Sequence, residues 1–134
     1  MSGVDPPEQE PLRVSILAQR AYLIASIHTA LDDEHFESFQ RDLIDQIGRR
    51  RARGVIIDVA ALDVLDSFGS RTLRDLGQVA RLRGAETVVV GIQPEVAFAM
   101  VQLGLTLKGV ATALDLEEGL AFLNRYTKER FERA

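Results

Sequence analysis

The chain has 134 residues, a length that favours one compact domain able to bury roughly two-thirds of its unfolded surface without disulfides or metals. It contains no cysteine, which excludes a disulfide framework and thiolate chemistry and fits a reducing compartment. Because the net charge is −4 and no apolar run approaches the ~18 residues of a membrane span, we expect a cytoplasmic protein that binds neither nucleic acid nor membrane.

Residues 1–11 differ in composition from the rest of the chain. They hold three of the four prolines together with Asp5, Glu8 and Glu10, so we predict a flexible N-terminal tail. Residues 12–134 contain no internal repeat and no linker, which predicts a single domain.

The N-terminal half predicts a hairpin followed by a helix. Two short β-prone runs cover residues 14–17 and 22–27, with a turn at Gln19-Arg20 between them. Asp32 or Asp33 can cap the helix that follows, and the cationic run 49–53 before Gly54 is typical of a helix end. The apolar residues of this helix recur at helical spacing: Phe36, Phe39, Leu43 and Ile47.

The C-terminal half alternates strands with helices. Residues 55–59 form a continuous apolar run broken only by Asp58, as in a strand covered on both faces. A helix over 67–82, a strand over 87–92, a helix from Pro94, a short strand over 110–113 and a last helix capped by Asp115 and Glu118 should follow. In the helix from Pro94, the inward positions are predicted to be Val96, Met100 and Leu103, with Gly104 just past its end. In the last helix they are predicted to be Leu116, Leu120 and Leu123.

This alternation predicts an α/β domain. We expect a mostly parallel or mixed sheet of four to five strands, packed with about four helices.

Ser67 lies at the start of the helix predicted over 67–82, directly after the acidic loop that contains Asp63 and Asp66. At about 100° per residue, one face of the helix is apolar and the other is polar. We predict a core side of Gly69, Leu73, Leu76 and Ala80, an outer arc of Ser67, Arg71, Arg74 and Gln78, and partly exposed Phe68 and Leu82 beside that arc.

Two interpretations of Ser67 are open and compatible. Serine is among the best N-caps and needs no further purpose. It is also suited to phosphorylation, because a phosphate there would meet the positive end of the helix, and Arg71 lies one turn on. Since Asp63 and Asp66 oppose the added charge, the effect should fall mainly on a docked partner that would have to desolvate the phosphate.

The segment Asp66-Ser67-Phe68-Gly69, after an apolar strand and a Leu-Asp loop, resembles the STAS domains of anti-sigma-factor antagonists, and among these the RsbS-type stressosome scaffolds. The likeness covers about residues 12–123. Its further segments are 22–24, 31–33, 53–58, 84–94 and 103–105.

The resemblance implies a regulatory scaffold without enzymatic activity or cofactor. It would bind an RsbT-type serine/threonine kinase, associate with itself and with RsbR-type STAS paralogues, release the kinase when Ser67 is phosphorylated, and be reset by a PP2C-type phosphatase. A direct anti-sigma-factor antagonist controlled at the same serine is the alternative. The implied partner interface comprises Asp66, Phe68, Gly69, Ser70, Arg71, Arg74, Gln78 and Leu82.

The sequence departs from RsbR-type proteins in two ways. Those proteins have threonine acceptors, one of them near the start of the first helix, where this chain has Asp32-Asp33-Glu34. They also have an N-terminal sensor domain, for which this chain has no room. Both differences favour the scaffold over the sensor, while residues 125–134 have no counterpart in the resemblance.

Other site chemistries have weaker support. Asp58 at a strand end suggests a phosphorylated receiver aspartate, but the first strand carries no acidic pair to hold a metal. Ser67 lacks the G-x-S-x-G pattern of a hydrolase nucleophile, and neither His28 nor His35 is tied to it by a signature. These histidines with Asp32 and Glu34 match no closed zinc pattern.

The arginine run 49–53 is interpreted as a solvated helix end or an assembly surface, since no aromatic residues are interleaved for nucleic-acid stacking. Neither phosphate-binding glycine motif is present, so a built-in nucleotide site has no support from motifs, although weak nucleotide binding stays open.

Overall fold

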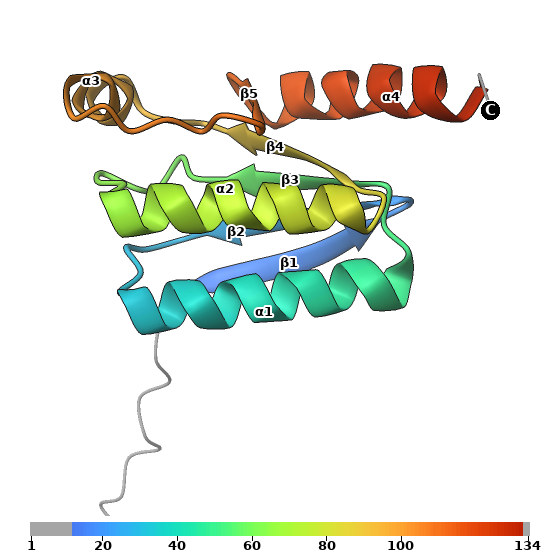
Figure 1. Cartoon of the computed structure of the whole chain (residues 1–134), viewed down its shortest axis with the longest axis horizontal. Helices are drawn as coiled ribbons and strands as arrows, with labels where there is room; N and C mark the ends of the chain where they lie inside the picture. Colours follow the sequence, from blue (N-terminus) through green and yellow to red (C-terminus); the bar gives the residue numbers. More distant parts are fainter. Residues whose placement is uncertain (1–11, 133–134) are drawn as a thin grey trace, which may run out of the picture.

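The computed structural model describes residues 12–132, with side chains to residue 128. A five-stranded sheet has the order β1-β2-β3-β4-β5, with β1 antiparallel to β2 and all other neighbours parallel (Figure 1). The fold class is therefore α/β with a mixed sheet, as predicted. The strands are β1 Val14–Gln19, β2 Tyr22–Ile27, β3 Gly54–Asp58, β4 Glu86–Val90 and β5 Ala111–Ala113.

Four helices cover the two faces of this sheet unequally. The apolar sides of α1 and α2 share one core with Val96 and Met100 of α3, whereas α4 packs on the other face against β3, β4 and β5. Figure 1 shows α1 and α2 lying side by side, with α4 apart from them. The helices are α1 Asp33–Arg50, α2 Ser67–Leu82, α3 Pro94–Gln102 and α4 Leu116–Glu132.

The central strand β3 is enclosed on both sides. Val55, Ile56 and Ile57 are each 0% exposed. Val55 and Ile57 belong to the core under α1 and α2, and Ile56 belongs to the core under α4. This double burial explains why the segment reads as a continuous apolar run, because neither face of the strand contacts water.

The helix ends follow the capping rules in part. Asp32 is the N-cap of α1 and accepts a hydrogen bond from the His35 N–H at 2.8 Å. That bond, together with the His35 ring, holds the pKa of Asp32 below its usual value. Asp115 accepts from the Glu118 N–H at 2.9 Å, which confirms the predicted cap of α4.

Three local predictions are wrong. The hairpin turn is Arg20-Ala21, one residue later than expected, since β1 extends through Gln19. Leu103 is 71% exposed, because α3 stops at Gln102 and Leu103 becomes its C-cap outside the helix. Leu116 is 38% exposed at the first position of α4, where the helix has not yet reached the sheet.

The strand register aligns the loops that matter for function. Ser26, Asp58, Val90 and Ala113 are partners across β2 to β5 at the carboxyl ends of these strands. The loops that leave β2, β3 and β4 therefore lie at one end of the molecule, on the left in Figure 1, while the connection from β5 to α4 lies nearer the middle of the view. The turns that precede β2, β3 and β4 gather at the opposite end.

The predicted tail, residues 1–11, lies outside the described residues. Within residues 12–132, none of the helices has both the length and the apolar character needed to cross a membrane.

Two arginines adopt the left-handed backbone conformation. Arg20 in the hairpin turn has φ 55°, and Arg51 at the C-cap of α1 has φ 50° and ψ 46°. A Cβ is disfavoured there, and helices that end this way usually place glycine at the position.

We predict that Arg51→Gly stabilises the protein by about 0.5–1 kcal/mol, because glycine adopts this conformation without the steric cost. Arg50→Gly, one residue earlier inside the helix, is the matched control and should destabilise it by about 1 kcal/mol. Urea unfolding measures both. A loss of stability in Arg51→Gly equal to that in Arg50→Gly would contradict the strain argument.

Candidate functional site

The loop between β3 and α2, residues 59–66, is held on the domain by two apolar anchors. Leu62 and Leu65 are 2% and 5% exposed, within the core shared by α1 and α2. The Asp58 carboxylate at the end of β3 accepts a hydrogen bond from the Ala60 N–H at 2.9 Å, which turns the chain away from the sheet. The loop is therefore a fixed connection to the start of α2.

The segment after β4 supports the same loop from the side. The Gln93 side-chain amide donates to the Ala60 carbonyl at 2.8 Å. Gly91 has φ 81°, and a Cβ there would lie 2.9 Å from the Ala60 Cβ, so only glycine allows this approach. Sequence reasoning missed both contacts, because they join segments about 30 residues apart.

Asp66, and not Ser67, is the N-cap of α2. The Asp66 carboxylate accepts from the Gly69 N–H at 2.8 Å, and the Asp66 carbonyl accepts from the Ser70 N–H at 2.9 Å. The prediction that Ser67 caps the helix is thus wrong by one residue. Aspartate and serine are nearly equal caps, so local sequence could not decide between them.

Ser67 is the first residue of α2, and its side chain is exposed. The N–H groups of Ser67 and Phe68 belong to the first turn, where an α-helix offers no internal acceptor. The Ser67 hydroxyl has no hydrogen-bond partner among the described residues and lies beside the positive end of a 16-residue helix, while Asp66 provides the cap.

The inner face of α2 matches its prediction. Gly69, Leu73, Leu76 and Ala80 are all buried. A Cβ on Gly69 would lie 3.0 Å from atoms of Leu65 and Phe36, so the glycine permits the close packing of α2 on α1.

Two residues expected at a partner interface are in fact inside the domain. Gly69 is buried, and Ser70 is 1% exposed with a hydroxyl that lacks a hydrogen-bond partner among the described residues. Both residues are therefore removed from the outer surface of the monomer.

The outer arc of α2 is exposed only in part. Arg71 and Gln78 are exposed and Leu82 is 87% exposed, whereas Arg74 and Phe68 are half-buried. The partial exposure of Phe68 is as predicted, and its ring packs against the core. Val64, which was not among the predicted interface residues, is 67% exposed three residues before Ser67.

The two histidines have partners other than Ser67. The His28 ring nitrogen Nε2 lies 3.0 Å from the Ser15 hydroxyl, and the His35 ring contacts Asp32. The described residues contain no group of three or more histidines, cysteines or carboxylates arranged to hold a metal ion.

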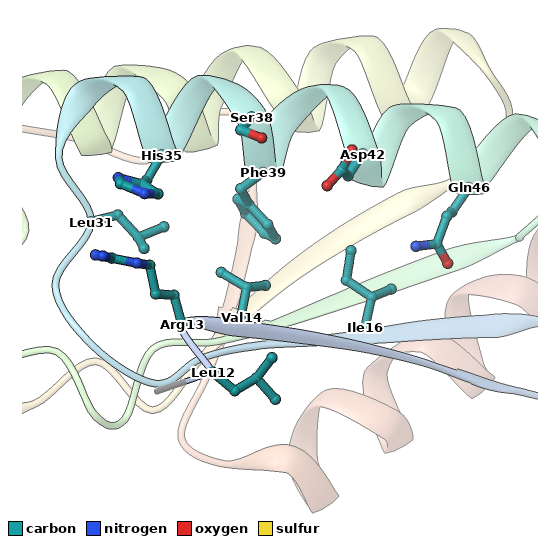
Figure 2. Close-up of a pocket in the computed structure, with 10 residues that line it drawn as sticks. All are labelled: Leu12, Arg13, Val14, Ile16, Leu31, His35, Ser38, Phe39, Asp42 and Gln46. Carbon is teal, nitrogen blue, oxygen red and sulfur yellow. The ribbon is translucent and has the colours of Figure 1, made fainter. Parts of the chain in front are cut away.

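A groove of about 580 Å³ runs between β1 and α1, away from Ser67 (Figure 2). Apolar side chains of β1, including Val14 and Ile16, form part of its lining together with Phe39 of α1. The labelled polar residues around it are Arg13, His35, Ser38, Asp42 and Gln46.

Comparison with known families identifies this architecture. The sequence model of the STAS domain matches residues 14–119, most of the chain. The chain belongs to the STAS domain family.

Solved structures of the same family superpose well. RsbS from Moorella thermoacetica, in a serine-to-glutamate variant, has a TM-score of 0.75 and 36% identity, covering 87% of this chain and 99% of that chain. A second solved structure is described as the molecular architecture of the stressosome, a signal integration and transduction hub. One of its chains has a TM-score of 0.67 and 33% identity, covering 85% of this chain and 99% of that chain.

The RsbR-type curated relatives are longer proteins. RsbT co-antagonist protein RsbRA of Bacillus subtilis is 29% identical over 90 residues, which are 67% of this chain and 33% of that protein. This STAS chain therefore spans about a third of the length of the curated relative.

We predict that Asp66→Ala lowers the free energy of unfolding by about 1 kcal/mol, because the Gly69 N–H loses its acceptor. Ser67→Ala, the adjacent control, should change it by less than about 0.5 kcal/mol, since the exposed hydroxyl holds no cap. Urea unfolding measures the free energy of unfolding of both variants. A larger effect at Ser67 would assign the cap to the serine.

Proposed function

We propose that this STAS protein is a regulatory scaffold of a stressosome-type complex. It sequesters a serine/threonine switch kinase and releases that kinase when Ser67 is phosphorylated. The observation that carries the proposal is the free, exposed Ser67 hydroxyl at the first turn of α2, beside a cap that aspartate already provides.

The chemistry of this position supports a switch. A phosphate adds about −1.5 to −2 charges at neutral pH. The free N–H groups of the first turn and Arg71, one turn on, favour that charge, and Asp63 and Asp66 disfavour it. Because these influences oppose each other at a solvated site, the fold tolerates the phosphate, and the main energetic effect falls on a partner that covers it.

The relatives support the choice of partners. RsbRA is named for antagonism of RsbT, and RsbS-type chains match this protein over nearly their full length. We infer an RsbT-type kinase as the sequestered partner, RsbR-type STAS paralogues and further copies of this chain as assembly partners, and a PP2C-type phosphatase that resets Ser67.

The docking surface for the kinase is drawn from the exposed residues around the serine. Val64 supplies an apolar contact, Ser67 the switch, and Arg71 and Gln78 the polar continuation along α2. Leu82 lies about 22 Å from Ser67 along the helix axis, at the far limit of such a contact. Gly69 and Ser70, which are buried, have no part in it.

Incubation with the RsbT-type kinase and ATP should place one phosphate on Ser67, as mapped by mass spectrometry. Ser67→Ala is the control and should remain unmodified. Phosphate on another residue, or none on the wild type, would refute the proposed switch.

The second expected result concerns affinity. Ser67→Asp should weaken kinase binding at least about tenfold, because the interface would bury an uncompensated carboxylate, while Ser67→Ala should bind as the wild type does. Isothermal titration calorimetry measures both. Thr29→Asp adds the same charge at an exposed loop off α2 and is the matched control. Equal affinities of Ser67→Asp and Ser67→Ala would exclude electrostatic blocking.

A further inference from the structure

The end of the molecule that precedes the parallel strands is strongly basic. Tyr22, Gly54 and Glu86 are aligned partners in the sheet, so the segments before them lie together, on the right in Figure 1. In these segments, residues 20–21, 49–53 and 83–85, every ionisable side chain is an arginine. The basic end is defined as Arg20, Arg49, Arg50, Arg51, Arg53 and Arg83.

The opposite end is acidic for the same topological reason. The segments that leave the aligned carboxyl ends, 28–34, 58–66, 91–95 and 114–118, contain carboxylates and neither lysine nor arginine. Asp32, Asp66 and Asp115 cap helices there. The acidic end is defined by the remaining exposed carboxylates of these segments: Asp33, Glu34, Asp63, Glu95, Glu117 and Glu118.

Helix polarity explains only part of this separation. Carboxylates suit helix starts and cations suit helix ends, and the two lie at opposite ends of this fold. Arg20 and Asp63, however, lie in connections outside any helix. Arg20, Arg50, Arg51 and Arg83 form no ion pair with any residue between 12 and 128.

Backbone strain is a second, independent observation at the basic end. Arg20 and Arg51 both occupy the left-handed conformation, where glycine or asparagine would be less costly. Their two loops are joined by a hydrogen bond from the Arg53 N–H to the Ala21 carbonyl at 2.8 Å. Strain concentrated in adjacent loops is typical of a functional surface, and here it presents guanidinium groups.

We propose that the basic end docks on the acidic end of a second copy of this chain. The inference rests on the proposed scaffold role only in requiring that copies associate; it names the surfaces through which they do so. A second copy is favoured as the occupant because every copy carries the complementary charge. Tyr22, the aromatic residue nearest these arginines in sequence, is half-buried with its hydroxyl bonded to Asn124, so it offers no free platform for stacked bases.

A contact between unlike ends is heterologous, so it leaves one free end of each kind on a pair. The association is expected to continue into longer species or a closed ring. Because the contact is between exposed charges, its strength should fall as salt shortens the screening length from about 10 Å at 0.1 M to about 3 Å at 1 M.

Charge exchange between the two ends tests the proposal by sedimentation velocity. Arg50→Glu with Arg51→Glu lowers the charge of the basic end by four units, and Asp63→Arg with Glu117→Arg raises the charge of the acidic end by four units, so each double variant keeps only one end intact. Each double variant alone should associate at least tenfold more weakly than the wild type in low salt. An equimolar mixture of the two should associate again, because their ends are complementary.

Two controls separate docking from folding. Asp42→Arg reverses an exposed charge near the middle of α1, between the two ends, and should leave association unchanged. Arg51→Gly should raise the melting temperature and yet weaken association, a combination that a merely structural role for Arg51 does not produce.

Several results would overturn the inference. Association that persists in both double variants, or a mixture that stays apart, rejects these surfaces but leaves the proposed scaffold and its Ser67 switch standing. A wild type that is monomeric in low salt and binds a single-stranded oligonucleotide through the same arginines assigns the basic end to a polyanion instead. Ser67 phosphorylation and kinase affinity are measured separately, so their failure is distinguishable from failure here.

Discussion

The double burial of β3 is the constraint on which the rest of the structure depends. With Val55, Ile56 and Ile57 removed from water, the sheet needs helices on both faces, and each parallel neighbour needs a helical crossover. The crossovers all begin at the same edge of the sheet. The start of α2, with Ser67, is therefore held at the surface by this core, to which Leu62 and Leu65 of the preceding loop belong.

Asp66 and Ser67 have separate roles at the start of α2, which makes this position suitable for the proposed switch. Asp66 satisfies the Gly69 N–H and so stabilises the start of α2, while the hydroxyl of Ser67 carries no structural duty. A serine that served as the cap would lose its acceptor geometry when modified. Here the proposed modification site and the helix cap are separated by one residue, so a charge added to Ser67 would leave the cap of α2 in place.

The same topology places acidic and basic side chains at opposite ends of the molecule. Helices that return from the carboxyl edge of a sheet to its amino edge collect carboxylates at their starts and cations at their ends. Capping accounts for Asp32, Asp66 and Asp115. The loop residues Arg20 and Asp63 extend the same separation beyond the helices. A domain with a net charge of −4 thereby presents a basic surface that its overall composition conceals.

The sequence by itself determined the order of the elements, the bounds of α2, its buried face and the exposure of Ser67, because hydrophobic periodicity records burial directly. Only the tertiary structure decided that Asp66 is the cap, that Ser70 lies inside, and that Leu103 is exposed. Aspartate and serine have nearly the same capping preference, so the local sequence could not choose between them. The contact of Gln93 with Ala60 joins distant segments, which no local pattern encodes.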